Sequence, residues 1–131
     1  AALAATFLPP ASVADLRAVH GRFADLEDAG HLDPEELQQL NHDFHRIINL
    51  AAPSRTRWLL GHLERSVPAN YFEFADGWNV AAVAHHRTIL EAIVSGDADG
   101  ARRAMEVHLE ASGEVAAAQL EARGFFDGTD S

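Results

Sequence analysis

The sequence predicts an all-α fold, an antiparallel helical bundle of about six helices, from three observations. Apolar residues recur three and four positions apart along most of the chain, which is the spacing of one buried helix face. Residues that start or stop helices divide the chain into segments of helical length. Alternating apolar and polar runs, the pattern of half-buried strands, are nearly lacking.

Most of the predicted helices have a recognisable first turn. Ser12, with a carboxylate three residues later, has the pattern of a capping box. Asp33 is an acidic N-cap followed directly by proline. Ser54, Asn79 and Asp97 are candidate N-caps of the next three helices. The predicted spans are 1–7, 12–30, 34–52, 54–67, 79–95 and 98–123.

The predicted buried faces follow the same periodicity. On the helix at 79–95 the core face is expected to comprise Val83, Ile89, Leu90, Ile93 and Val94. Large aromatic side chains elsewhere are interpreted as core or as the wall of a pocket; they are Phe44, Trp58, Phe72 and Phe74.

Composition excludes several classes of function. The 131 residues include no cysteine, which excludes disulfides, thiolate metal sites and cysteine nucleophiles. A net charge of −10 argues against direct nucleic-acid binding, which requires clustered Lys and Arg. There is neither an apolar run of the ~18 residues that a membrane span needs nor a basic amino end typical of a signal peptide. We expect a single cytoplasmic domain over residues 1–131, without membrane contact.

The positions of the eight histidines suggest a site. His86 lies within roughly 40° of the centre of its helix's apolar face, whereas His85 is about 140° away. His108 is near the middle of the next helix's inward face. Asn41 and His45, four residues apart, share the border of an apolar stripe. An amide oxygen and three imidazoles could converge on one divalent ion, or the core histidines could simply be hydrogen-bonded. The other five are predicted to be surface residues: His20, His31, His42, His62 and His85.

Four segments carry a family resemblance. They are residues 41–45 (Asn-His-Asp-Phe-His), 86–93 (His-Arg-Thr-Ile-Leu-Glu-Ala-Ile), the Gly-Asp pair at 96–97, and 101–109, which ends in Ala-Met-Glu-Val-His-Leu. Their order and spacing, over roughly residues 12–123, resemble the ligand-sensing C-terminal domain of FadR-type GntR transcription regulators. This resemblance implies a bundle of six or seven helices that binds a small carboxylate effector at a divalent metal.

The resemblance also implies a set of site residues. The metal ligands would be Asn41, His45, His86 and His108. The ion would be zinc, nickel or manganese. Asn41 stands where many members have aspartate, His85 where glutamate is common, and Ser54-Arg55 replaces a usual Gly-Asn. Candidate effector contacts, placed near the bundle end or the metal face, are Arg65, Asn70, Tyr71 and Ser112.

The resulting functional expectation is a non-enzymatic sensor without catalytic residues, the homodimeric effector domain of a bacterial transcription regulator. In such regulators DNA is bound by an N-terminal winged helix-turn-helix, which this chain does not contain, and the first helix here is expected to be truncated. One alternative is a metal-dependent hydrolase or lyase, which would need a general base beside the metal. Another is a purely structural helical module whose buried histidines are hydrogen-bonded.

Overall fold

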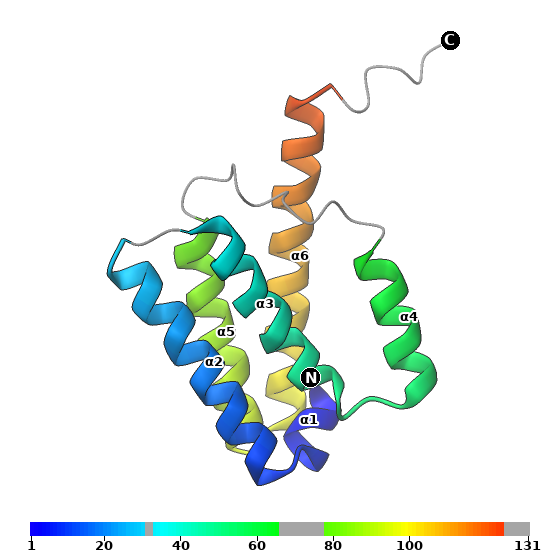
Figure 1. Cartoon of the computed structure of the whole chain (residues 1–131). Coiled ribbons are helices and arrows are strands. Elements are labelled where there is room, and N and C mark those ends of the chain that lie inside the picture. The colour runs from blue at the N-terminus through cyan, green and yellow to red at the C-terminus, as the bar shows by residue number, and fades with distance from the viewer. Residues whose placement is uncertain (31–32, 66–77, 125–131) are drawn as a thin grey trace.

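The computed structural model describes residues 1–30, 33–65 and 78–124, and in these ranges every regular element is a helix. This confirms the predicted all-α bundle. The helices, shown in Figure 1, are α1 (Ala2–Phe7), α2 (Pro10–Asp28), α3 (Pro34–Asn49), α4 (Ser54–Glu64), α5 (Trp78–Val94) and α6 (Ala98–Ala122).

Two of the predicted helix starts are confirmed by side-chain caps. Asp33 accepts a hydrogen bond from the Glu35 backbone N–H at 3.1 Å, and Asp97 accepts one from the Gly100 N–H at 2.8 Å. Each bond satisfies a backbone donor that has no partner within the helix. At the opposite ends, Gly30 and Gly96 adopt positive φ angles of 64° and 72° just beyond α2 and α5, the backbone geometry that favours glycine there.

The other predicted boundaries are wrong by a few residues. α2 begins at Pro10 with Pro9 as its N-cap, so Ser12 lies inside the helix, because the fixed φ of proline suits a first helical turn. Ser54 is the first helical residue of α4 and makes no capping bond, and α5 already begins one residue before Asn79. α3 ends at Asn49 rather than at residue 52.

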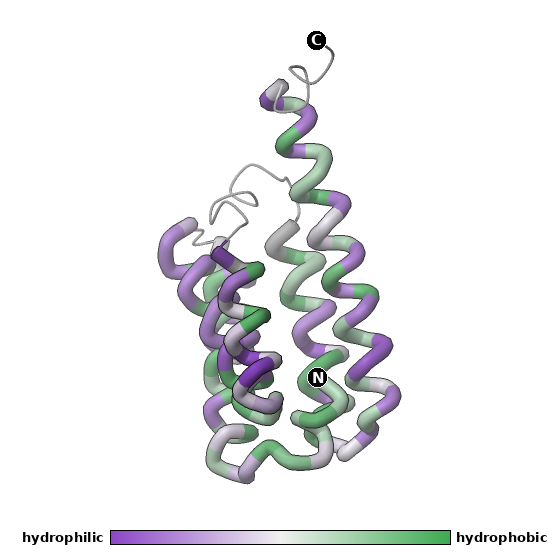
Figure 2. The backbone as a smooth tube through the Cα atoms, turned by 90° about the vertical axis from the view of Figure 1, so that its right-hand side faces the viewer, coloured by the Kyte–Doolittle hydropathy of each residue, from purple (hydrophilic) through white to green (hydrophobic). Residues whose placement is uncertain are grey.

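The core is built around α5. This helix packs against α2 and α6, while α2 also packs against α3, and the short α1 covers one end of α5 and α6. In Figure 2, hydrophobic and hydrophilic residues alternate around the helices, as expected of amphipathic helices in a bundle. Two groups of buried side chains fill the interior, one containing Leu16, Phe44 and Ile89 and the other Phe23 and Leu37. The C-terminal turns of α6 project beyond the other helices.

Two predicted core residues are exposed. Val94 is 41 % exposed, because it is the last residue of α5 and lies at the edge of the buried face. Trp58 is 68 % exposed, because α4 stands apart from the rest of the bundle (Figure 1) and its apolar face meets no other helix closely. Phe44 is fully buried as predicted, and Phe72 and Phe74 lie outside the described residues.

Candidate metal centre

Three histidines from three helices meet inside the bundle. His45 of α3, His86 of α5 and His108 of α6 each present a ring nitrogen, and these atoms all lie within 4.8 Å of one another. The ring centroids are separated by 5.1 Å for His45 and His108, 5.3 Å for His45 and His86, and 4.8 Å for His86 and His108. The structure therefore brings together the three histidines among the four predicted ligands, and their binding of a metal stays a prediction.

Helical periodicity explains why the side chains of His86 and His108 point into the bundle. His86 is 0 % exposed, and Ala82, Val83, Ile89 and Leu90, three and four residues away on either side, are buried with it. His108 is 2 % exposed and follows the fully buried Ala101 by two turns. Residues at these spacings share one helix face, so packing that face against the core carries the imidazoles inward.

His45 reaches the cluster from the border of its helix face. Its neighbour Phe44 is fully buried, and His45 itself is partly buried. The Phe44 ring stacks on the His86 ring at 4.1 Å with an interplanar angle of 13° and meets the His45 ring edge-on at 5.7 Å. Phe44 thus supports two imidazoles at once and limits how far either can rotate.

One nitrogen–nitrogen distance in the cluster fits either a hydrogen bond between two imidazoles or a shared metal ion. His45 Nε2 and His108 Nε2 lie 3.2 Å apart. Two imidazole nitrogens bound to one tetrahedral zinc ion are separated by about 3.3 Å. Both ring nitrogens of His86 are buried without a hydrogen-bond partner among the described residues. Because such groups are costly to bury unsatisfied, a metal bond to His86 would remove one of these deficits.

Burial lowers the pKa values of the three imidazoles, so they are neutral at pH 7. Burial, reinforced by the neighbouring His108, lowers the pKa of His45 to about 3. Burial, with a smaller contribution from His85, lowers the pKa of His108 to about 4. The pKa of His86 is also well below its ordinary value, chiefly through burial and then through His45. Neutral imidazole is the form that binds metal, so the site is prepared for a cation at neutral pH.

The other predicted site residues are not part of the three-histidine cluster as the structure describes it. Asn41 is partly buried on α3, one turn before His45, and its ligation stays a prediction. Ser112 is buried one turn after His108, and its hydroxyl donates to the His108 carbonyl oxygen at 2.7 Å. Arg65 is exposed at the C-terminal end of α4. Two further candidate effector contacts, Asn70 and Tyr71, lie outside the described residues.

Of the five predicted surface histidines, His20 is buried and His85 is partly buried. His20 is only 8 % exposed, and its pKa is lowered by burial and then by the charge of Arg87. The prediction failed although a signal was present, since His20 shares a helix face with the buried Leu16 and Phe23. His85 is partly buried, with its ring 5.7 Å from that of His108. The other predicted surface histidines are His42 and His62, which are exposed, and His31, which lies outside the described residues.

Comparison with known proteins gives one clear result. Residues 1–111 match the FCD domain family. Neither the curated proteins nor the solved structures contain a match to this chain. Among the described helices, none combines the length and apolar composition that crossing a membrane requires. Domains of this family are the regulatory, effector-binding parts of transcription factors that also carry a DNA-binding domain. The chain therefore belongs to the FCD family, the C-terminal domain of GntR/FadR-type transcription regulators.

Proposed function

We propose that this domain senses a small carboxylate effector through one divalent metal ion bound by His45, His86 and His108, with Asn41 as a weaker fourth ligand. The observation that carries the proposal is the convergence of three inward-facing imidazole nitrogens within 4.8 Å. Their burial and lowered pKa values support it, because both favour the neutral, metal-binding form.

The donor set narrows the choice of metal. Imidazole nitrogens suit zinc and nickel, and an amide oxygen from Asn41 would leave room for manganese. Neutral ligands do not offset the charge of the ion, so its full positive charge would remain available to an anion. In a domain of net charge −10, such a buried cation gives a carboxylate effector a strong local attraction. When bound, the ion supplies a Lewis-acid anchor for that carboxylate.

The surroundings of the cluster favour sensing over catalysis. A metal-dependent hydrolase or lyase needs a general base beside the ion. The Asp43 carboxylate is instead held by Gln39 and Arg46, each at 3.2 Å. Glu106 is exposed and bound by Arg102 at 2.8 Å. Asp43 and Glu106, each two residues from a histidine of the cluster, are thus engaged outside it, and Glu110, which is equally near His108 in sequence, is exposed.

The effector would extend from the metal toward the polar groups around it. Ser112 lies one turn beyond His108, and because its hydroxyl proton is already donated, it would act as an acceptor. Arg65, Asn70 and Tyr71 complete the proposed contact set. The complete regulator is proposed to be a cytoplasmic homodimer that binds DNA through a separate N-terminal domain. The exposed apolar residues of α4, Trp58, Leu59 and Leu63, offer a surface for the second copy.

Cobalt substitution would test the proposal without knowledge of the natural effector. The metal-free domain would be loaded with Co²⁺, whose visible absorption reports its ligands, and titrated with acetate as the carboxylate probe. We expect saturable changes in the cobalt bands for the wild type and for His85→Ala. His86→Ala should not retain the ion. Cobalt bands that are unchanged by acetate would contradict metal-mediated sensing and leave the ion a structural role.

A further inference from the structure

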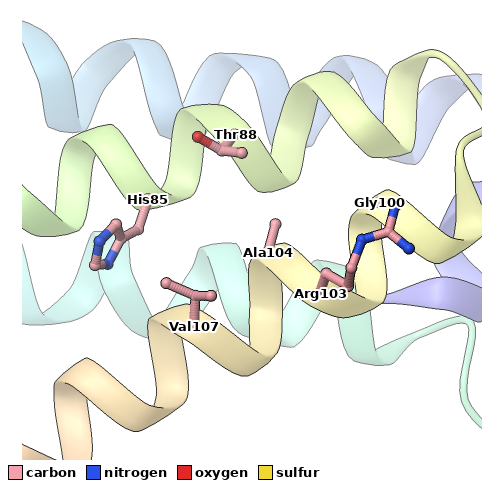
Figure 3. A pocket seen from close by; sticks show the side chains of 6 residues that line it. All are labelled: His85, Thr88, Gly100, Arg103, Ala104 and Val107. Carbon is pink, nitrogen blue, oxygen red and sulfur yellow. The ribbon is translucent and has the colours of Figure 1, made fainter.

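A second candidate binding site lies on the outer side of α5 and α6. It is a groove of about 300 Å³ between the two helices, shown in Figure 3. The residues that line it are His85, Thr88, Gly100, Arg103, Ala104 and Val107. The three histidines of the metal centre are not among them. The volume is at the lower end of the range for ligand sites, so the groove suits a small molecule.

The groove has polar ends and an apolar middle. In Figure 3, Arg103 lies toward one end and His85 toward the other, with Ala104 and Val107 between them. Thr88 lines the α5 side, but its hydroxyl already donates to the Ala84 carbonyl oxygen at 3.2 Å. The charged group at one end of the groove is therefore the Arg103 guanidinium, and the His85 imidazole forms the wall at the other end.

Arg103 and the adjacent Arg102 differ in whether they form an ion pair with a described carboxylate. Arg102 binds both carboxylate oxygens of Glu106, at 2.8 and 3.0 Å. Within the described part of the chain, Arg103 makes no ion pair, although Asp99 lies one helical turn before it. A guanidinium presents paired donors that match the two oxygens of a carboxylate. In a domain of net charge −10, a guanidinium at the end of a groove that forms no ion pair with the described residues points to an anionic ligand.

We propose that this groove binds a small carboxylate with a short aliphatic chain. Its carboxylate would pair with Arg103, and its chain would cover Ala104 and Val107. The imidazole of His85 would border the far end of the groove. There its ring lies edge-on to the ring of His108, with 5.7 Å between the ring centroids. This site is independent of the proposed metal-bound effector, because none of its contacts requires a metal ion.

Butanoate is a suitable probe, and chelator-stripped protein separates this site from the metal centre. Amide chemical shifts would be followed by NMR during titration with butanoate, and with 1-butanol as the uncharged analogue. We expect saturable shifts in residues 85–88 and 100–107 with butanoate and none with butanol. Arg103→Ala should weaken binding at least about tenfold, since it removes a charge-assisted pair, whereas Arg102→Ala should leave it within about twofold.

A second pair of variants tests the apolar middle of the groove. Val107 and Leu109 are almost equally exposed, at 55 % and 56 %, but only Val107 lines the groove. Val107→Glu should therefore repel butanoate and weaken binding about tenfold or more, whereas Leu109→Glu should have little effect. Absence of saturable shifts, or equal losses in the members of either pair, would overturn the proposal. Failure here would leave the cobalt experiment unaffected, since that experiment depends on the metal centre alone.

Discussion

Acid should destabilise the metal-free domain steeply, through the histidines of the cluster. The pKa of His45 in the folded state is lowered to about 3 and that of His108 to about 4, and that of His86 is also well below its ordinary value. In the unfolded chain each would titrate near ~6.5. The unfolded state thus binds more protons below that pH, so stability falls as the pH decreases from about 6.5 toward the folded pKa values.

The expected magnitude follows from proton counting. Each histidine that is neutral when folded and protonated when unfolded changes the free energy of unfolding by about 1.4 kcal/mol per pH unit. In the unfolded chain, however, each histidine is only about half protonated on average between pH 7.5 and 5.5, so each contributes about 1.4 kcal/mol over this whole interval. Three such residues give a loss of about 4 kcal/mol, a large part of the ~5–15 kcal/mol of a typical domain. Asp43 does not interfere in this window, because hydrogen bonding to Gln39 lowers the pKa of its carboxyl below the ordinary value.

Urea denaturation of the chelator-treated domain, followed by circular dichroism, would measure this effect at the two pH values. His86→Leu should lower the pH-dependent loss of stability by about 1.4 kcal/mol relative to the wild type, because one titrating group is removed. Equal free energies of unfolding at pH 7.5 and 5.5 in the wild type would refute the conclusion that the cluster is buried in the neutral form.

Three other substitutions probe separate features. His20→Leu should leave the metal content unchanged and raise the free energy of unfolding at neutral pH by about 1 kcal/mol in urea titrations, since His20 Nδ1 is buried without a partner among the described residues; a loss of stability would contradict this. Asp97→Ala should lower the free energy of unfolding by about 1 kcal/mol by removing the α6 cap, with the exposed Asp99→Ala as control; equal losses in urea titrations would exclude a capping role. Trp58→Glu should shift the proposed dimer toward monomer in light scattering after gel filtration, whereas the adjacent Arg57→Glu should not; an unchanged mass for Trp58→Glu would argue against α4 as the dimer surface.

Local interactions explain which parts of the fold could be predicted from sequence. The caps at Asp33 and Asp97 depend on a side chain and the next few backbone N–H groups, so they are visible in the sequence. The exposure of Trp58 was not predictable in this way. An apolar helix face indicates that burial is favourable, but periodicity does not say whether another helix of the same chain supplies the contact.

In the metal centre, too, local features could be predicted from the sequence, whereas contacts between distant helices could not. The inward directions of His86 and His108 follow from the apolar residues around them in sequence. The approach of His45 Nε2 to His108 Nε2 joins residues 63 positions apart, and it depends on how α2 and α5 hold α3 and α6 in the bundle. The burial of His20, by contrast, follows from its own helix, because Leu16 and Phe23 lie four and three residues away on the same buried face. In the bundle that face is covered because α2 packs against both α3 and α5.

Metal content of the purified domain tests the central claim most directly. After equilibration with zinc and removal of the free ion, elemental analysis should find about one zinc per chain in the wild type and in His85→Ala. His86→Ala and His108→Ala should each retain almost none, while circular dichroism shows that their helices persist. Full zinc occupancy in a folded His86→Ala or His108→Ala domain would contradict the assignment of the three histidines as the metal centre.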